Sequence, residues 1–187
     1  MFQVAVVVGS LRKDSINRKL ALSLDQLVHP LLTFTYPDIT DIPLYNQDLE
    51  TDMPESVLRF KQEIQKADAV LWVTPEYNRS IPGVLKNIID WGTRPAGQTV
   101  WPGKVMASMG TSPGAIGTAV AQSHLRSIMV TLGGIFMGQP EMYLVYKDGL
   151  IDDSYHITVD TTRELLQKFI DQLAVAITRK TSSQEGQ

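Results

Sequence analysis

A loop rich in hydroxyl and charged side chains follows the first apolar run of the chain. After Val4–Val8, the side chains Ser10, Arg12, Ser15 and Asn17 gather just before an apolar helical pattern begins. Hydroxyl, amide and guanidinium groups at a helix start donate to anionic oxygens, and the unpaired N–H groups of the first helical turn add to them. The residue types and their spacing therefore indicate a cradle for a terminal phosphate.

The same residues also allow a purely structural interpretation. Ser15 or Asn17 can cap the helix with its side-chain oxygen, and the neighbouring cations can form a solvated face. Those cations are Arg12, Lys13, Arg18 and Lys19. Taken alone, the loop favours neither interpretation.

Two widespread phosphate-binding motifs are absent from the sequence. Gly9 is the only glycine of the loop, so the dinucleotide pattern G-x-G-x-x-G is missing. Residues 97–104 come nearest to a P-loop, but they have one residue too many between their glycines. Val105 also stands where the metal-binding hydroxyl belongs. Neither of these two cradles is therefore expected.

A second polar loop, residues 74–83, follows the apolar run Ala69–Val73. Pro75 and Pro82 restrict its backbone, which could hold peptide N–H and C=O groups in a fixed array against a flat heteroaromatic ligand. The alternative is a plain turn before a helix whose Trp91 packs in the core. Because it is expected at the same sheet edge as the first loop, the second loop favours a ligand site there.

A third loop imitates the nucleophile elbow of serine hydrolases. Residues 110–114 fit G-x-S-x-G between a strand and a helix. The oxyanion hole of such an elbow needs the N–H of the residue after Ser112, and Pro113 has none. An acid and a histidine must also follow, which leaves mainly Asp152, Asp153 and His156. The sequence therefore argues against a hydrolase.

Metal and thiol chemistry are not expected. His29, His124 and His156 are scattered and lack an i, i+4 partner. The chain has 0 Cys, so thiolate ligands, disulfides and thiol nucleophiles are not available.

Strand-like and helix-like patterns alternate along the chain, which predicts an α/β fold with a parallel sheet covered by helices on both faces. Strands are expected at 4–8, 33–36, 69–73, 104–109 and around 135–145. Helices are expected at 16–28 and 55–68, and after a capping box at 161–164. A short helix is expected to carry Leu85, Ile88 and Ile89, and another to carry the apolar face of Leu125, Ile128, Met129 and Leu132 and to stop at Gly133-Gly134. Ligands of such sheets lie beyond the carboxyl ends of the strands, where strand order reverses. In the order 2-1-3-4-5, that point lies between strands one and three.

Composition predicts one globular domain at residues 1–180, followed by a polar, disordered tail at 181–187. The 187 residues are 43% apolar and 20% charged, which is ordinary for a soluble protein. The formal net charge of -3 offers no general attraction for nucleic acid or for an anionic membrane. No signal or membrane segment is visible, so a cytoplasmic location without membrane insertion is expected.

Residues 75–91 resemble the signature of the NADPH-dependent FMN reductase family, in particular its chromate and quinone reductase branch. The matching residues are Pro75, Glu76, Tyr77, Asn78, Ser80, Pro82, Gly83, Leu85, Lys86, Asn87, Asp90 and Trp91. Residues 9–17 resemble the phosphate loop of the same family, and 112–117 and 124–126 match it in the expected order. The resemblance implies a flavodoxin-like three-layer sandwich that binds FMN non-covalently.

The resemblance also implies a set of cofactor-binding residues. The FMN phosphate would lie on Ser10, Arg12, Ser15, Ile16 and Asn17. The isoalloxazine would lie on Pro75, Glu76, Tyr77 and Asn78, and its pyrimidine edge would meet the loop of Ser112 and Gly114.

Other positions are assigned less central roles by the resemblance. Arg79 and Thr118 vary among relatives and are candidates for tuning substrate preference. Arg126 and Glu141 are candidates for contacts in a homodimer or homotetramer, or else solvated charges. Trp101 could cover the flavin of a neighbouring subunit or pack locally.

The function that we expect is FMN-dependent NAD(P)H oxidation, in which hydride passes through bound FMN to small acceptors such as quinones, chromate, azo compounds or free flavin. FMN would carry the chemistry, so no side chain need be catalytic. The donor is NADPH or NADH. The alternative is a flavodoxin-type electron carrier that oxidises no nicotinamide itself. Against it, the first loop lacks the Thr and Gly pattern of such carriers, and the net charge is only mildly acidic.

Overall fold

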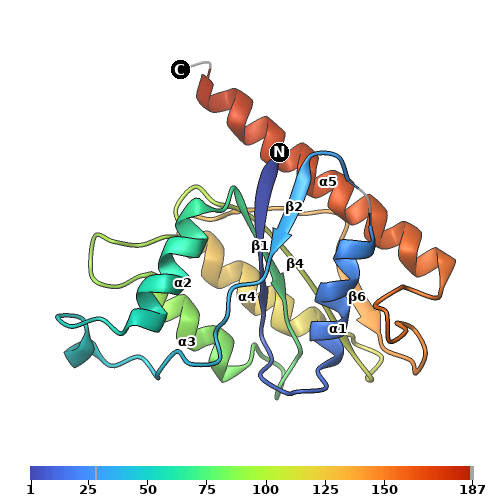
Figure 1. Cartoon of the computed structure of the whole chain (residues 1–187), viewed down its shortest axis with the longest axis horizontal. Helices are drawn as coiled ribbons and strands as arrows, with labels where there is room; N and C mark the ends of the chain where they lie inside the picture. The colour runs from blue at the N-terminus through green and yellow to red at the C-terminus, as the bar shows by residue number, and fades with distance from the viewer. Residues whose placement is uncertain (28, 186–187) are drawn as a thin grey trace.

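The sheet of the protein is parallel and has the strand order β2-β1-β3-β4-β5, with β6 also paired to β4. The computed structural model describes residues 1–27 and 29–185 (Figure 1). The strands are β1 Phe2–Val8, β2 Leu32–Thr35, β3 Ala69–Val73, β4 Val105–Ser112, β5 Ile135–Phe136 and β6 Met142–Val145. The order 2-1-3-4-5 predicted from the sequence is confirmed.

The single fifth strand expected around 135–145 is instead two short strands. β5 pairs with the beginning of β4, at Val105 and Met106, and β6 pairs with its end, from Met109 to Ser112. Pro140 lies between the two strands and has no N–H for a sheet ladder, which explains why pairing is interrupted there.

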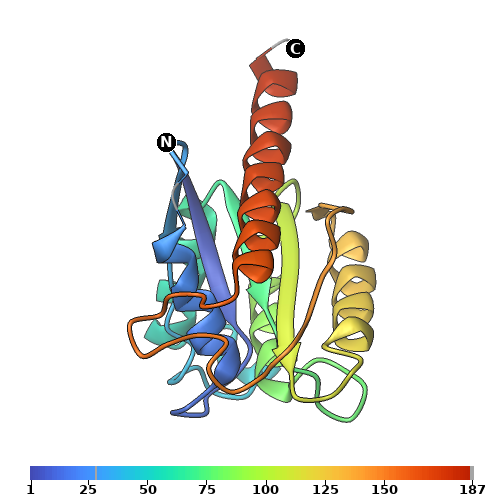
Figure 2. The ribbon, with the colours of Figure 1, turned by 90° about the vertical axis from the view of Figure 1, so that its right-hand side faces the viewer.

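Helices cover both faces of the sheet and form the predicted three layers (Figures 1 and 2). They are α1 Ile16–Leu22, α2 Glu55–Lys66, α3 Gly83–Gly92, α4 Ala119–Thr131 and α5 Asp160–Glu185, with short 3-10 turns at Ser23–Gln26 and Gln47–Leu49. One buried cluster joins the sheet to α1 and α5, for example through Leu20 and Phe169. A second cluster joins the other face to α2, α3 and α4, through residues such as Phe60 and Leu125.

The ends of two helices differ from the sequence-based expectation. The first α-helix stops at Leu22 and continues as a 3-10 turn to Gln26, while residue 28 lies outside the described residues. The last helix begins at Asp160, so Thr161 lies inside its first turn and the expected capping box is wrong.

The polar segment after residue 180 continues α5 rather than forming an irregular tail. The helix runs to Glu185 and projects past the amino ends of the strands (Figure 2). Thr181 Oγ1 donates to the carbonyl of Ile177, and Ser183 Oγ donates to that of Arg179, which ties these polar side chains to the preceding turn. The domain boundary predicted at residue 180 therefore falls within α5, and 186–187 lie outside the described residues.

Of the two alternatives that the sequence left for Trp101, the structure shows local packing. It is fully buried within the chain, against Trp72 at a ring-centroid distance of 5.4 Å. Its Nε1 donates to the carbonyl of Ile89 at 3.0 Å. A Cβ on Gly92 would stand 2.2 Å from the indole ring, so the tight packing depends on that glycine.

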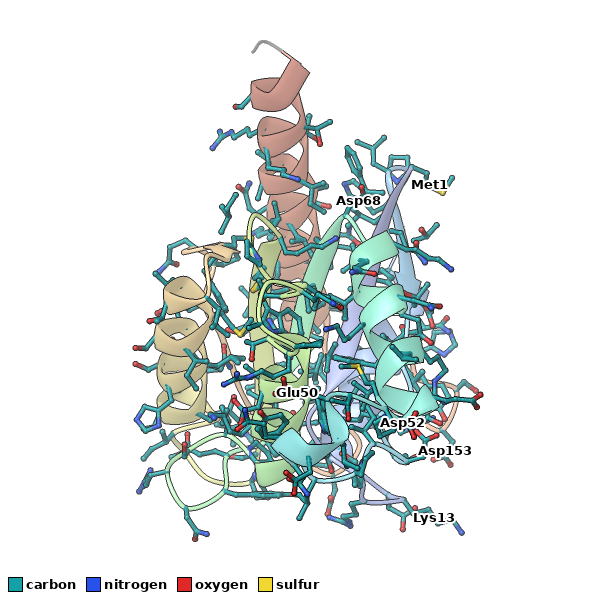
Figure 3. The ribbon with its side chains drawn as sticks, turned by 90° about the vertical axis from the view of Figure 1, so that its left-hand side faces the viewer. Met1, Lys13, Glu50, Asp52, Asp68 and Asp153 are labelled. Carbon is teal, nitrogen blue, oxygen red and sulfur yellow. The ribbon has the colours of Figure 1, made fainter. Side chains whose placement is uncertain are left out.

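The loops that follow the strands gather at one end of the sheet. Figure 3 shows Lys13, Asp52 and Asp153 at this end, whereas Met1 and Asp68 lie at the opposite, amino end of the strands. Among the described residues, no helix is long and apolar enough to cross a membrane.

Candidate functional site

The loops after β1, β3 and β4 enclose a small cavity at the carboxyl edge of the sheet. Its volume is about 170 Å³, and it is lined by Ser10, Arg12, Ser15, Ile16, Asn17, Pro75, Glu76, Tyr77, Thr111, Ser112 and Pro113. Of the cofactor-binding residues predicted from the sequence, only Asn78 and Gly114 do not line it. The predicted residues are thus brought together at the predicted edge of the sheet.

Close packing at the ends of the central strands brings these loops together. Val8 of β1 pairs with Val73 of β3, and the N–H of Gly9 donates to the carbonyl of Val73 at 2.9 Å. A Cβ on Gly9 would lie 3.3 Å from Leu85 and 3.5 Å from Pro75. The first loop therefore starts in contact with the second.

The start of α1 is compatible with both interpretations that the sequence left open, namely helix capping and phosphate binding. Ser15 is the N-cap residue, and its Oγ accepts the N–H of Arg18 at 3.2 Å. A hydroxyl that accepts in this way still has its own hydrogen to donate. The N–H groups of Ile16 and Asn17, the first of the helix, have no acceptor within it. Capping and anion binding are therefore compatible here.

The Asn17 side chain joins α1 to β4. Its Nδ2 donates to the carbonyl of Thr111 at 2.9 Å, and its Oδ1 accepts the N–H of Thr111 at 3.0 Å. This paired contact is buried. It uses most of the hydrogen-bonding capacity of the amide, so the backbone N–H of Asn17 is a better donor to a ligand than its side chain.

Thr111 is the functional candidate that sequence reasoning missed. The residue is buried and belongs to the cavity lining, and its Oγ1 has no hydrogen-bond partner among the described residues. Buried polar atoms without a partner are rare in folded proteins, which points to a partner supplied from outside the chain. Its place beside Ser112, at the end of a central strand, was the available signal.

Arg12 places a cation at the rim of the cavity. Its side chain is exposed, and the described part of the chain offers it no ion pair or hydrogen bond. Its backbone N–H faces Ser10 Oγ at 3.4 Å. The guanidinium is therefore available to an anionic group in the cavity.

The loop after β3 is a tight hairpin. The N–H and C=O groups of Tyr77 and Ser80 exchange two hydrogen bonds of 3.0 Å. Between them, Asn78 and Arg79 have φ values of 51° and 63°. Left-handed conformations at both central residues define a type I′ turn. Half of the Tyr77 side chain is exposed, so the hairpin offers an aromatic ring and backbone groups at the cavity mouth.

The third loop is held by its own hydroxyl group. Ser112 Oγ donates to the carbonyl of Gly117 at 2.6 Å. The ring of His124 contacts Ser80 instead, and that of His156 contacts Asp152. Ser112 therefore has no histidine to activate it among the described residues.

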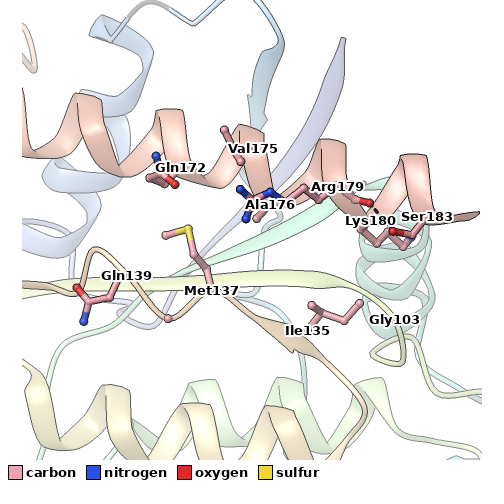
Figure 4. A pocket seen from close by; sticks show the side chains of 11 residues that line it. Gly103, Ile135, Met137, Gln139, Gln172, Val175, Ala176, Arg179, Lys180 and Ser183 are labelled. Atoms are coloured by element: carbon pink, nitrogen blue, oxygen red, sulfur yellow. Dashed lines mark hydrogen bonds between the residues drawn. The ribbon is translucent and has the colours of Figure 1, made fainter.

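A larger cavity of about 640 Å³ lies at the opposite edge of the sheet, between α5 and the chain around β5 (Figure 4). Met137, Gln172 and Arg179 are among its lining residues. None of the cofactor-binding residues predicted from the sequence takes part in it.

Comparison with known proteins decides the family. The sequence profile of the NADPH-dependent FMN reductases matches residues 2–148. The chain belongs to this family. The resemblance seen in the sequence is thereby confirmed, together with the enzyme class and with FMN and NAD(P)H as cofactor and donor.

Individual relatives of this reductase are similar over nearly its whole length. A 2-hydroxy-1,4-benzoquinone reductase of a Burkholderia species is 52% identical over 172 residues, which cover 92% of this chain and 94% of that protein. A quinone reductase of Pseudomonas putida is 49% identical over 175 residues, 93% of this chain and 94% of that protein. The structure of FerB, a flavoenzyme NAD(P)H:(acceptor) oxidoreductase from Paracoccus denitrificans, superposes with a TM-score of 0.92 at 47% identity. It covers 96% of this reductase and 99% of that chain.

Proposed function

We propose that this reductase holds FMN at the cavity between the β1, β3 and β4 loops and passes hydride from NAD(P)H to quinones. The observation that carries the proposal is that the three loops meet at one cavity, where the exposed guanidinium of Arg12 has no partner among the described residues. Two relatives that match nearly the whole chain are quinone reductases, which supports quinone as the acceptor.

The cavity fits one end of an FMN molecule. Its volume of about 170 Å³ is below the roughly 300–1,000 Å³ of pockets that enclose a whole ligand. The donors are concentrated on the β1 loop, at Ser15, Ile16 and Arg12, which favours the phosphate there. The isoalloxazine then extends along the hairpin of Pro75–Asn78, and the pyrimidine edge reaches the loop of Ser112 and Gly114.

When bound, FMN supplies the hydride chemistry, and the protein supplies binding, orientation and electrostatics. In this division, Arg12 and the first N–H groups of α1 balance the phosphate charge. The type I′ hairpin holds its backbone groups fixed, which lowers the ordering cost of binding a flat ring. No side chain of the site is required to transfer a proton.

We also propose assembly into a homodimer or homotetramer. Within one chain, Arg126 Nη2 already lies 3.4 Å from Glu141 Oε1, and its guanidinium lies 5.2 Å from the ring of Phe136. Both side chains remain partly exposed, so they are still accessible to a second subunit. Light scattering of the purified protein tests the assembly, and a monomer would contradict it. The cytoplasmic location stays a prediction.

Direct reduction by nicotinamide tests the proposed activity. The FMN-loaded protein is mixed anaerobically with NADPH and then with NADH, and the visible absorbance of the flavin is followed. We expect rapid bleaching by at least one donor and recovery of the absorbance when a benzoquinone is added. If neither donor bleaches the flavin without a partner reductase, the chain is an electron carrier instead. Bleaching without recovery would exclude quinones as acceptors.

Thr111→Val is expected to change the affinity for FMN without lowering the stability of the protein. Valine has the shape of threonine without the hydroxyl, and that hydroxyl has no partner within the described part of the chain. We therefore expect the unfolding temperature of the apo-protein to stay the same or to rise. The dissociation constant for FMN should rise about 3- to 10-fold, because a net hydrogen bond of about 0.5–1.5 kcal/mol is lost. Fluorescence titration measures the affinity, and unchanged affinity would show that FMN does not use this hydroxyl.

A further inference from the structure

The Glu76 carboxylate is directed at the start of α4. Its Oε2 accepts the N–H groups of Val120 and Ala121 at 3.0 and 3.1 Å. The side chain is only 9% exposed, although its residue belongs to the β3 loop. Because the first N–H groups of a helix have no acceptor within it, Glu76 caps α4 from a distant part of the chain.

Helix α4 has no cap of its own. Thr118 occupies the N-cap position but makes no side-chain bond to the helix amides, and the first turn contains no acidic residue. The Thr118 Oγ1 instead accepts Nε2 of the buried Gln122 at 2.8 Å. Glu76 therefore supplies both the missing acceptor and a negative charge at the positive end of the helix dipole.

This contact joins two of the three loops around the cavity. Glu76 stands between Pro75 and Tyr77 in the β3 loop, whereas α4 begins where the β4 loop ends. The β4 loop is held near the start of α4, because Ser112 Oγ donates to the carbonyl of Gly117 at 2.6 Å. A shift of either loop would have to stretch the two hydrogen bonds of Glu76.

The other side-chain contacts of the hairpin, made by Arg79 and Ser80, are weaker. Arg79 Nη1 lies 3.4 Å from Glu76 Oε1, but the arginine side chain is 65% exposed, and exposed ion pairs contribute little. Ser80 Oγ lies 3.1 Å from Nδ1 of His124, on the exposed side of the hairpin. The buried carboxylate is therefore the main connection from this hairpin to α4.

We propose that Glu76 is a positioning residue for the flavin, which acts through α4 and fixes the spacing between the β3 and β4 loops. The inference rests on the proposed function, in which these two loops hold the isoalloxazine and its pyrimidine edge. It gives the side chain a role different from the direct cofactor contact that the family resemblance implies, and it leaves the backbone of the loop to meet FMN.

Two substitutions of Glu76 and one control distinguish the effect of its side-chain length from the effect of its negative charge. Glu76→Gln keeps the length of the side chain, and its amide oxygen can still accept both N–H groups without a negative charge. Glu76→Asp keeps the charge but is one methylene too short to reach α4. Arg79→Ala is the control, because it removes a neighbouring charged side chain and leaves the two bonds to α4 in place.

Two measurements are made on each variant. Hydrogen exchange of the backbone amides at 119–122 in the FMN-free protein reports the cap, and fluorescence titration reports the dissociation constant for FMN. We expect Glu76→Asp to accelerate exchange and to weaken FMN binding about 10-fold. Glu76→Gln should restore most of the affinity, and Arg79→Ala should stay within about 2-fold of the native protein.

Other outcomes overturn the inference. If Glu76→Asp accelerates exchange at α4 but leaves FMN affinity unchanged, Glu76 is a helix cap and nothing more. If the Glu76→Asp variant binds FMN better than the Glu76→Gln variant does, the negative charge of the side chain matters rather than its length. Failure of the native protein to bind FMN at all would instead refute the proposed function, while exchange at 119–122 would still report the cap.

Discussion

Gly110→Ala is expected to destabilise the protein by about 3 kcal/mol, the upper part of the usual range for overpacking. A Cβ at this position would stand 2.2 Å from the carbonyl oxygen of Thr74 and 2.3 Å from Oγ1 of Thr118. Real Cβ atoms do not approach other atoms so closely, so one of these neighbours must move. The carbonyl belongs to the backbone at the end of β3 and has little freedom to do so.

The same substitution is expected to weaken FMN binding, since both displaced groups begin elements of the site. Thr74 opens the β3 loop, and Thr118 is the residue from which α4 starts. Chemical denaturation of the FMN-free protein measures the stability, and fluorescence titration measures the affinity. Gly138→Ala is the matched control, because its Cβ would meet no atom within 4 Å.

A small loss of stability in Gly110→Ala, comparable with that of Gly138→Ala, would contradict this account of the loop. It would mean that the β3 loop and α4 can separate without cost. The result also bears on the G-x-S-x-G pattern of residues 110–114, because steric demand explains the first glycine of that pattern without any nucleophile.

The edge of the sheet that carries the site was predictable because its signals are local. Runs such as Val4–Val8 and Ala69–Val73 are apolar and continuous, as expected for strands buried on both faces. Each is followed by polar residues and then by a helical pattern. Since the carboxyl ends of parallel strands share one edge, the polar loops could be placed together before any coordinates were known.

The features that sequence reasoning missed depend on contacts between distant residues. Asn17 and Thr111 are separated by 94 positions, and Glu76 and Val120 by 44. A family signature identifies Asn17 and Glu76 as residues of the site, but it does not say that their side chains are occupied by other parts of the chain. Thr111 was missed for the same reason, because its unpaired hydroxyl is visible only once its surroundings are known.

Pro140 marks the break in the last strand locally, but the pairing partners of its two halves could not be predicted from local patterns. β5 is only two residues long, and it forms because Ile135 and Phe136 can pair with the start of β4. A strand so short has no periodicity of its own. β5 is a strand only because it pairs with β4. That neighbouring strand has eight residues, and its first half pairs with β5 while its second half pairs with β6.

Arg12→Ala is expected to raise the dissociation constant for FMN about 10- to 150-fold. A hydrogen bond to a charged group contributes about 1.5–3 kcal/mol, and each 1.4 kcal/mol is a factor of ten. The Arg12 side chain is exposed and has no partner among the described residues, so its removal should leave the apo-protein equally stable. Titration of the FMN-free protein with FMN and with riboflavin measures the effect.

Riboflavin and Lys13→Ala give the two controls for this result. Riboflavin lacks the phosphate, so its affinity should be the same in the native protein and in Arg12→Ala. Lys13 is an exposed cation next to Arg12 that does not line the cavity. At physiological ionic strength, salt screens a charge that makes no direct contact, and Lys13→Ala should change FMN affinity by less than about 2-fold.

The pattern across these titrations identifies what the β1 loop binds. A loss confined to FMN and to Arg12→Ala means that the guanidinium contacts the phosphate directly. Equal losses in Arg12→Ala and Lys13→Ala would mean that the loop attracts anions only through its general charge. Equal losses for FMN and riboflavin would place Arg12 against the ring system, and the phosphate would then have to lie elsewhere along the carboxyl edge of the sheet.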